Sequence, residues 1–225
     1  MTDRSALVSG GNRGIGLEVC RQLAELGMHV LLGSRDLEAG ERAAASIGSD
    51  VHAVRLDVAD RAGVQRLRED IGPDGVDVLI NNAAIYPRDH PVERDASMIE
   101  AAWQVNLLGA WRLVRAFSPP MVERGWGRIV NVSTGLAEHA HKGGGGIYRQ
   151  TKIALNAMTR ALAEELEGTG VLVNAISPGW CRTDMGGNEA GRSAAQGAAS
   201  IVWGVTLADD GPTGGYFYDG EPLTW

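Results

Sequence analysis

The sequence predicts an α/β fold in which a doubly wound, mostly parallel sheet of about seven strands lies between two layers of helices. Two observations favour this fold class. Short runs of β-branched residues and leucine alternate with longer helical segments, and such alternation implies parallel βαβ units with helices on both faces of a sheet. The first of these runs leads into a glycine-rich turn and then a helix, which is how doubly wound folds begin.

Seven segments have the composition of buried strands and are bounded by turn residues. They are residues 6–9, 29–33, 51–56, 76–81, 127–133, 171–177 and, with the weakest signal, 215–218. A helix is expected over about 14–26, ending at Gly27, and another after Asp36, which is a good N-cap. The segment 96–122 is apolar nearly all round and predicts a helix buried on more than one side. The Gly/Ala-rich stretch 184–200 indicates a mobile loop with a short helix.

Composition and charge exclude several other classes of protein. With 225 residues and 44% apolar composition, and with no repeat or change of composition, the chain is expected to form one Rossmann-type domain over 1–225. Its formal charge of −7 argues against nucleic-acid or anionic-membrane partners. No run approaches the ~20 apolar residues of a membrane span, and no signal peptide is apparent. Cys20 and Cys181 match no metal or redox spacing, so we expect reduced thiols, no metal and a cytoplasmic location.

The glycine turn that follows the first predicted strand reads SGGNRGIG, over residues 9–16. Gly10, Gly14 and Gly16 allow the backbone to approach a ligand closely, and the following helix begins with free N–H groups suited to a pyrophosphate. The commoner dinucleotide fingerprint is not matched in full, because Val19 stands where it has its last glycine. The alternative to a nucleotide site is a glycine-rich turn that binds no ligand. We predict a dinucleotide site here.

The residues after the second predicted strand indicate which dinucleotide binds. An NAD site places an acid there for the ribose hydroxyls, whereas a 2′-phosphate requires cations. This chain has Ser34 at the strand end and Arg35 next to it, and Arg13 lies within the glycine turn. NADP(H) is therefore expected. Asp36 keeps NAD(H) as an alternative, although its position suits a helix cap better.

The segment YRQTK opens a helical run after four glycines. At ~100° per residue, Tyr148 and Lys152 share one stripe with Leu155 and Leu166, which faces the sheet, where an unpaired lysine would be costly. A cation four residues from a phenol is expected to lower the tyrosine pKa from ~10, so that Tyr148 exchanges a proton with a substrate oxygen. The alternative is that Lys152 extends to water and Tyr148 only packs.

Two polar residues elsewhere are candidates for the same site. Ser133 follows a strand whose carboxyl end is expected to face the ligand crevice, where its hydroxyl could bind the same substrate oxygen or only satisfy a loop. Asn106 is polar within an apolar helix, which indicates either a kink or a buried hydrogen bond.

Taken in order, these motifs resemble one family, the short-chain dehydrogenases/reductases. The resemblance covers essentially the whole chain, and the last stretch, with Trp225, looks most like the carbonyl-reductase branch. It rests on the turn at 9–16, LDV at 56–58, NNAA at 81–84, VN at 105–106, VS at 132–133, YRQTK at 148–152 and SPGWCRTDM at 177–185. The family usually has glycine at Ala84 and serine at Arg149, so this chain departs from the pattern twice beside the cofactor or substrate.

The resemblance implies a role for each matching residue. Asn106 would hold a water that relays protons to Lys152, which would also bind the nicotinamide ribose. The implied catalytic residues are Asn106, Ser133, Tyr148 and Lys152. The expected cofactor-binding residues are Gly10, Asn12, Arg13, Gly14, Ile15, Gly16, Ser34, Arg35, Asp57, Val58, Asn82, Ala83, Tyr148, Lys152, Pro178, Gly179 and Thr183.

The expected substrate pocket is largely apolar, which favours a hydrophobic aldehyde or ketone over a sugar. Its wall comprises Tyr86, Leu136, Gly143 to Gly146, Trp180 and the 184–200 segment. We expect NADPH-dependent reduction of such a carbonyl to an alcohol, with Tyr148 as general acid. The alternatives are an NAD(P)-dependent alcohol dehydrogenase, a biosynthetic ketoreductase with a specific substrate, and a non-catalytic NADP-binding sensor.

A homodimer or homotetramer is also expected. Small apolar residues lie opposite the Tyr148 stripe, and the helix over 96–122 is apolar all round, so both helices are suited to packing between subunits. The residues on the opposite face are Ile153, Ala154, Ala157 and Ala161. The resemblance supports the same expectation, because members of the family commonly pair through these two helices.

Overall fold

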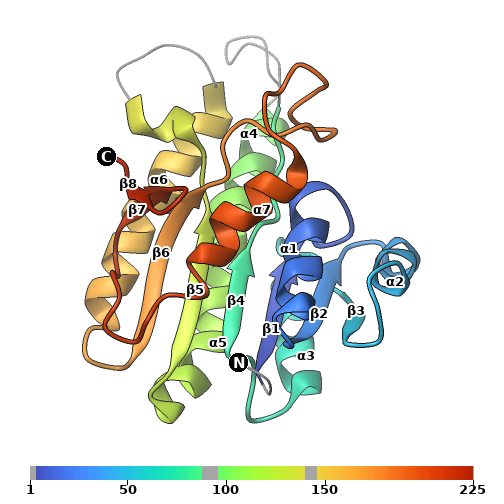
Figure 1. The fold of residues 1–225 in the computed structure, drawn as a ribbon, viewed down its shortest axis with the longest axis vertical. Coiled ribbons are helices and arrows are strands. Elements are labelled where there is room, and N and C mark those ends of the chain that lie inside the picture. The colour runs from blue at the N-terminus through green and yellow to red at the C-terminus, as the bar shows by residue number, and fades with distance from the viewer. Residues whose placement is uncertain (1–3, 88–95, 140–145, 225) are drawn as a thin grey trace.

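One eight-stranded sheet forms the centre of the protein in the computed structural model, which describes residues 4–87, 96–139 and 146–224 (Figure 1). The strands are β1 (Ser5–Ser9), β2 (His29–Ser34), β3 (Val51–Arg55), β4 (Val78–Asn81), β5 (Gly127–Val132), β6 (Val171–Ser177), β7 (Tyr216–Tyr218) and β8 (Glu221–Pro222). Their order across the sheet is β3-β2-β1-β4-β5-β6-β7-β8, and all neighbours are parallel except β7 and β8. The predicted doubly wound, mostly parallel sheet is confirmed.

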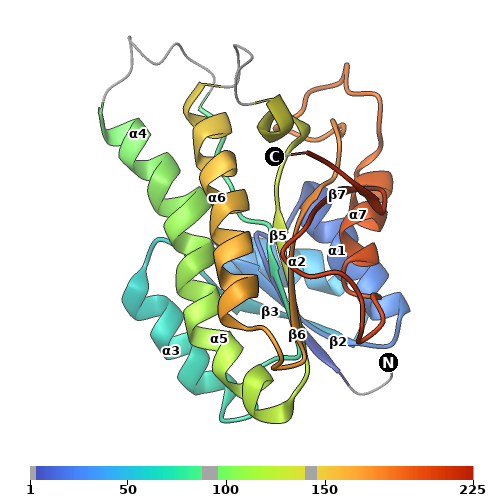
Figure 2. The ribbon, with the colours of Figure 1, turned by 90° about the vertical axis from the view of Figure 1, so that its left-hand side faces the viewer.

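Helices cover both faces of this sheet, as Figure 2 shows. They are α1 (Gly14–Glu25), α2 (Leu37–Ala45), α3 (Arg61–Ile71), α4 (Ala96–Trp103), α5 (Ala110–Arg124), α6 (Gly146–Glu165) and α7 (Ala194–Trp203), with a π-helical turn η1 (Gln104–Gly109) and a 3₁₀ turn η2 (Gly135–His139). One hydrophobic core lies between the sheet and α1, α2 and α7, and a second lies between the sheet and α3, α5 and α6. None of the helices in the described ranges is long and apolar enough to cross a membrane.

The strand order reverses direction at β1, and this reversal determines where a ligand can bind. Val8 of β1 pairs with Leu32 of β2 on one side and with Ile80 of β4 on the other. The connections after β1 and β4 therefore leave toward opposite sides of the sheet and open a crevice beyond the carboxyl ends of these strands.

Three predicted segments differ in detail from the structure. The chain has an eighth strand, because Asp219 and Gly220 both adopt positive φ angles, 49° and 84°, which form a tight turn and fold Glu221–Pro222 back onto β7. The stretch 184–200 contains the first part of α7, whose N-terminus is closed by a capping box between Ser193 and Gln196.

The third difference concerns the apolar segment 96–122, which forms α4, η1 and most of α5 rather than one regular helix. It was predicted to be buried on more than one side. In this chain Met98 is 45% exposed and Trp111 is 41% exposed, so part of its apolar surface faces outward.

Candidate active site

A single cleft at the carboxyl ends of β1, β4 and β5 brings together most of the predicted site residues. The predicted residues that line it are Gly10, Asn12, Arg13, Gly14, Ile15, Gly16, Arg35, Asp57, Val58, Asn82, Ala83, Ser133, Tyr148, Lys152, Pro178 and Thr183. The cleft is also lined by Leu56, Ala84, Ile85, Val105 and Val132, which were not predicted as site residues, and by Asp184 and Met185, which begin the 184–200 segment predicted for the substrate-pocket wall. Residues from both halves of the chain thus meet at one place.

Two predicted cofactor residues do not line this cleft. Ser34 is buried, and its Oγ donates to the carbonyl oxygen of Asp36 at 2.6 Å, so its hydroxyl is used within the chain. Gly179 has a φ of 75°, and a Cβ there would lie 2.6 Å from Cδ of Arg192. Gly179 therefore shapes the loop after β6 instead of facing the cleft.

The three residues predicted for the substrate pocket also lie outside the cleft lining. Tyr86 packs edge-on against the Tyr148 ring, with 4.7 Å between the ring centroids, so it is a neighbour of the site. Leu136 is 37% exposed, and Trp180 is 61% exposed with its Nε1 donating to the carbonyl oxygen of Gly186. Gly143 to Gly145, predicted for the same wall, and Trp225 lie outside the described residues.

The glycine turn has the close backbone approach that its sequence predicts. Gly10 and Gly14 have φ angles of 66° and 57°, and a Cβ on Gly16 would lie 2.3 Å from the carbonyl oxygen of Gly10. Asn82 lines the cleft and also braces this turn, because its Nδ2 donates to the carbonyl oxygens of Ser9 and Gly10, both at 3.0 Å. Ser9 was not singled out in the sequence, since nothing in its local pattern shows that it would accept from the backbone N–H groups of Asn82 and Ala83.

The N-terminus of α1 fits a phosphate group. Arg13 occupies the N-cap position without a side-chain capping bond, and no acid stands in the first turn of the helix. The first N–H groups of a helix have no intrahelical partner and carry partial positive charge, so an anion binds well there. Gly14 lies close to Thr183 across the cleft lining, because a Cβ added to Gly14 would be 3.2 Å from Cγ2 of Thr183. These residues fit the pyrophosphate of a dinucleotide.

The region after β2 settles the structural role of Asp36. Its carboxylate accepts from the backbone N–H of Ala39 at 3.1 Å and caps α2, as its position in the sequence suggested. Asp36 does not line the cleft, whereas Arg35 does.

Lys152 is buried on the inner face of α6, only 1% exposed. Its Nζ donates to the carbonyl oxygen of Val132 at 2.6 Å and lies 5.7 Å from the centroid of the Tyr148 ring. Burial lowers the pKa of Lys152 to about 7, because the charged form loses its hydration. The lysine is therefore a cation mainly below neutral pH.

Tyr148 does not show the lowered pKa that the Tyr148–Lys152 spacing predicted. Burial raises its pKa above the usual value, the electrostatic effect of Tyr86 raises it further, and a hydrogen bond with the Thr134 side chain acts in the opposite direction. The prediction was wrong because desolvation of the phenolate outweighs the influence of a lysine that is itself partly neutral. Tyr148 is consequently protonated at neutral pH, in the form that can donate a proton.

Ser133 belongs to a hydrogen-bond network that sequence reasoning missed. Its Oγ donates to Oδ1 of Asn156 at 2.6 Å. Tyr216 of β7 also bonds to the Ser133 side chain, and its hydroxyl donates to the carbonyl oxygen of Thr134 at 2.5 Å. Asn156 follows Lys152 by four residues on the same helical stripe, and this spacing was the available signal. Tyr216 had no comparable signal, because its contact joins residues 82 positions apart.

Asn106 lies in η1, behind the cleft, and shows both features that the sequence left open. The helix is irregular at this point, and the amide is buried. Its Oδ1 accepts from the backbone N–H of Ile85 at 2.8 Å, while its Nδ2 donates to the Ile85 carbonyl oxygen and to Oγ1 of Thr151. Oγ1 of Thr151 in turn donates to the carbonyl oxygen of Tyr148 at 2.7 Å. Asn106 therefore connects the segment after β4 to the helix that carries Tyr148.

The two departures from the family pattern lie close to the site. Ala84 lines the cleft, and Arg149, which follows Tyr148 on α6, is buried. Neither replaces a residue predicted to react.

Comparisons with known proteins agree with this geometry. The family described as short chain dehydrogenase matches residues 4–193. The acetoacetyl-CoA reductase of Cupriavidus necator is 36% identical over 197 residues, covering 82% of this chain and 77% of that protein. The 3-oxoacyl-[acyl-carrier-protein] reductase FabG of Aquifex aeolicus is 34% identical over 187 residues, covering 80% of this chain and 75% of that protein.

A solved structure matches the chain over nearly its whole length. The carbonyl reductase Sniffer of D. melanogaster superposes with a TM-score of 0.90 at 28% identity and covers 99% of both chains. With the fold, the cleft and the family match, these similarities show that the chain belongs to the short-chain dehydrogenase/reductase family of oxidoreductases, which act on keto and alcohol groups with a nicotinamide cofactor.

Proposed function

We propose that this protein reduces a hydrophobic aldehyde or ketone to the alcohol, using NADPH as the hydride donor. The observation that carries the proposal is the meeting of Ser133, Tyr148 and Lys152 in the same cleft as the glycine turn of β1 and α1. A dinucleotide held by that turn would share the cleft with these side chains, which would bring a hydride donor and a proton donor to one carbonyl group.

The proton chemistry follows from the state of each side chain. The hydride for the carbonyl carbon would come from the nicotinamide of the bound cofactor. Tyr148, held protonated by burial, donates its hydroxyl proton to the carbonyl oxygen, which completes the alcohol. Ser133 donates a hydrogen bond to the same oxygen once its hydroxyl turns from Asn156. Lys152 in its cationic form stabilises the phenolate that Tyr148 becomes, at 5.7 Å from the ring centroid.

The use of NADPH is supported by the charges at the other end of the cleft. Arg13 and Arg35 both line it, and the acid that would suit NAD, Asp36, is engaged as the cap of α2. Two cations beside one ribose, with Asp36 occupied as a helix cap, favour a 2′-phosphate over two free hydroxyls.

The hydrophobic substrate is supported by the side chains around the catalytic end. Ile85, Val105 and Met185 line the cleft, and Met185 is 38% exposed. Apolar walls with few charged groups bind an uncharged carbonyl compound best.

A second candidate is the reduction of a β-ketoacyl thioester, which would make the protein a biosynthetic ketoreductase. It is favoured by the 36% identity with an acetoacetyl-CoA reductase and the 34% identity with a 3-oxoacyl-[acyl-carrier-protein] reductase. The same residues would also catalyse the reverse oxidation of an alcohol. The formal charge of −7 disfavours the anionic coenzyme A or carrier-protein group as a partner and places this candidate second.

The test is a matched panel of substrates. Purified protein is mixed with NADPH or NADH and with hydrophobic aldehydes, hydrophobic ketones or acetoacetyl-CoA, and loss of the reduced nicotinamide absorbance is followed. The proposal predicts faster turnover with NADPH and with the free hydrophobic carbonyls. Higher kcat/KM for acetoacetyl-CoA would establish the second candidate instead, and faster turnover with NADH would contradict the cofactor assignment.

We also propose that two or four copies assemble in the cytoplasm. Met98 on α4 and Trp111 on α5 are exposed, α4 packs against α6, and Ala157 and Ala161 of α6 are exposed as well. Together they form a surface suited to a second copy of the chain. Cys20 and Cys181 are free and buried, which suits a reducing compartment. Sedimentation of the Trp111→Arg variant should show a smaller species than that of the unaltered chain.

A further inference from the structure

An ion pair lies at the end of the cleft that Arg13 and Arg35 line, which we call the adenosine end because the adenosine ribose is proposed to bind there, and it has no role in the proton chemistry above. Nη1 of Arg13 lies 2.8 Å from Oδ2 of Asp184, joining the glycine turn to the loop between β6 and α7. Both residues line the cleft. Arg35 lines it too, but no ion pair or hydrogen bond in the described ranges engages the Arg35 side chain. The two arginines at this end are therefore in different states.

This ion pair is too exposed to be explained by stability of the fold. The Arg13 and Asp184 side chains are 69% and 77% exposed, and pairs in water at such exposure contribute little to stability. The loop that carries Asp184 is held independently by partly buried hydrogen bonds, among them Gly186 N–H to Oγ1 of Thr183 and Arg182 Nη1 to the carbonyl oxygen of Ala190. Asp184 is therefore of interest because it lies in the cleft beside Arg13, and not because the ion pair stabilises the fold.

A carboxylate on Arg13 has opposite consequences for the two cofactors. A 2′-phosphate carries close to two negative charges at neutral pH, so it competes with Asp184 for the guanidinium and is repelled by its carboxylate. The 2′-hydroxyl of NADH is uncharged and experiences neither effect. NADPH and NADH share the pyrophosphate, so repulsion between Asp184 and that group weakens the binding of both cofactors equally. It therefore cancels in the ratio of their dissociation constants.

We propose that Asp184 is a specificity-determining residue that acts through Arg13 and limits the preference for NADPH over NADH. The inference rests on the proposed NADPH use, in which Arg13 binds the 2′-phosphate. Asp184 contacts no reacting atom. It sets how much of the Arg13 charge is available to the 2′-phosphate. Arg35 supplies a second cation, for which Asp184 does not compete.

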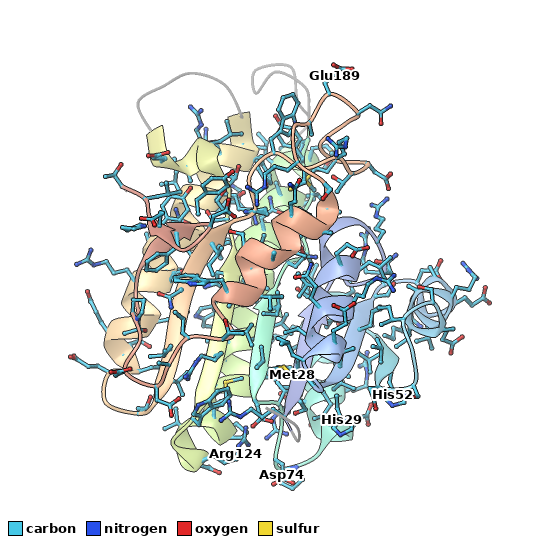
Figure 3. The ribbon with its side chains drawn as sticks, viewed as in Figure 1. Met28, His29, His52, Asp74, Arg124 and Glu189 are labelled. Atoms are coloured by element: carbon cyan, nitrogen blue, oxygen red, sulfur yellow. The ribbon has the colours of Figure 1, made fainter. Side chains whose placement is uncertain are left out.

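The experiment compares dissociation constants of NADPH and NADH, measured by fluorescence titration of the full chain without substrate. Asp184→Asn removes the carboxylate charge and keeps the side-chain shape, and the ratio of NADH to NADPH dissociation constants should rise about three- to tenfold. Glu189→Gln is the matched control, because it makes the same charge change at the outer tip of the same loop, away from the cleft (Figure 3). It should leave the ratio unchanged.

A double variant tests whether the effect passes through Arg13. In an Arg13→Gln background, Asp184→Asn should change the ratio much less, because the competed cation is gone and only direct repulsion by the carboxylate remains. Suppose that Arg13→Gln reduces the preference for NADPH, as the cofactor proposal requires. The inference is then overturned if Asp184→Asn leaves the ratio of dissociation constants unchanged, as Glu189→Gln does, or if Asp184→Asn selectively weakens the binding of NADPH. If the unaltered chain shows no preference for NADPH and Arg13→Gln changes nothing, the proposed cofactor and the inference both fail.

Discussion

The two ends of the cleft place charged side chains in very different surroundings. At the catalytic end Lys152 is 1% exposed, and burial alone lowers its pKa to about 7. At the adenosine end the paired side chains of Arg13 and Asp184 are 69% and 77% exposed. Electrostatic interactions are strong where water is excluded and are weakened by solvent and salt at the surface. Substitutions at the catalytic end should therefore change rates steeply, and those at the adenosine end should change affinities modestly and in a salt-dependent way.

The largest effect is expected for Lys152. Lys152→Met removes the cation that stabilises the Tyr148 phenolate, and kcat/KM for carbonyl reduction should fall by about 10²-fold or more. The assay is steady-state reduction with NADPH. Lys152→Arg is the control, because it keeps a cation, and it should retain more activity than the Met variant. Equal activity of the Met variant and the unaltered chain would show that the buried charge has no part in the reaction.

The pH profile sharpens the same point. Lys152 is cationic below its pKa of about 7, and Tyr148, with its raised pKa, stays protonated well above that pH. For the unaltered chain, kcat/KM for reduction should thus be highest on the acid side and decline as the pH rises through about 7. Lys152→Arg should remove this decline, since arginine does not titrate there.

The adenosine end should respond through binding. Arg35→Asp replaces a cation in the cleft by an anion, and NADPH should bind about tenfold more weakly or worse at low salt, with NADH much less affected. The difference should shrink when the ionic strength rises from about 0.05 to 0.5 M. Arg42→Asp, on an exposed position of α2 outside the cleft, is the charge-matched control. Equal weakening of NADPH and NADH would contradict the assignment of Arg35.

A smaller effect is expected for Asn156, which acts through Ser133 and not on the substrate. Asn156→Ala removes the acceptor at 2.6 Å that competes with the substrate oxygen for the Ser133 hydroxyl proton, and kcat should rise about fivefold with little change in the Kd of NADPH. In a Ser133→Ala background the same change should have no further effect on kcat. A fall in kcat in both backgrounds would mean that Asn156 supports the fold rather than competing for the hydroxyl.

A separate effect, on stability rather than on activity, compares the same buried lysine with its apolar replacement. The unfolded chain holds the Lys152 proton up to about 10, whereas the native state releases it near 7, so the unfolded state binds more protons between these values. The unfolding free energy of the unaltered chain should therefore rise with pH above about 7, relative to Lys152→Met, by at most ~1.4 kcal/mol per pH unit. Denaturant titrations from about pH 6 to 9 at one protein concentration measure it. A difference independent of pH would contradict the lowered pKa.

The sequence was most informative where a signal is local. The spacing of Gly10, Gly14 and Gly16 after a strand, and of Tyr148 and Lys152 on one helix, can be read from a few residues because backbone geometry determines which side chains share a face. Asp36 was interpreted as a helix cap for the same reason, and the structure confirms it.

Properties that depend on distant contacts could not be predicted in this way. The raised pKa of Tyr148 reflects burial under Tyr86 and the surrounding chain, which no spacing on α6 reveals. Asp184 meets Arg13 across 171 positions of sequence. Trp180 was expected in the pocket wall, but its side chain is largely exposed and bonds within its own loop.

The most direct test of the account is single-turnover reduction of a hydrophobic carbonyl by NADPH, comparing the unaltered chain with Tyr148→Phe. The variant keeps the aromatic ring that packs on Tyr86 and loses only the proton to be donated. We predict that its rate falls by about 10²-fold or more while NADPH still binds. A Tyr148→Phe variant that reduces the same substrate within a few-fold of the original rate would show that Tyr148 is not the general acid.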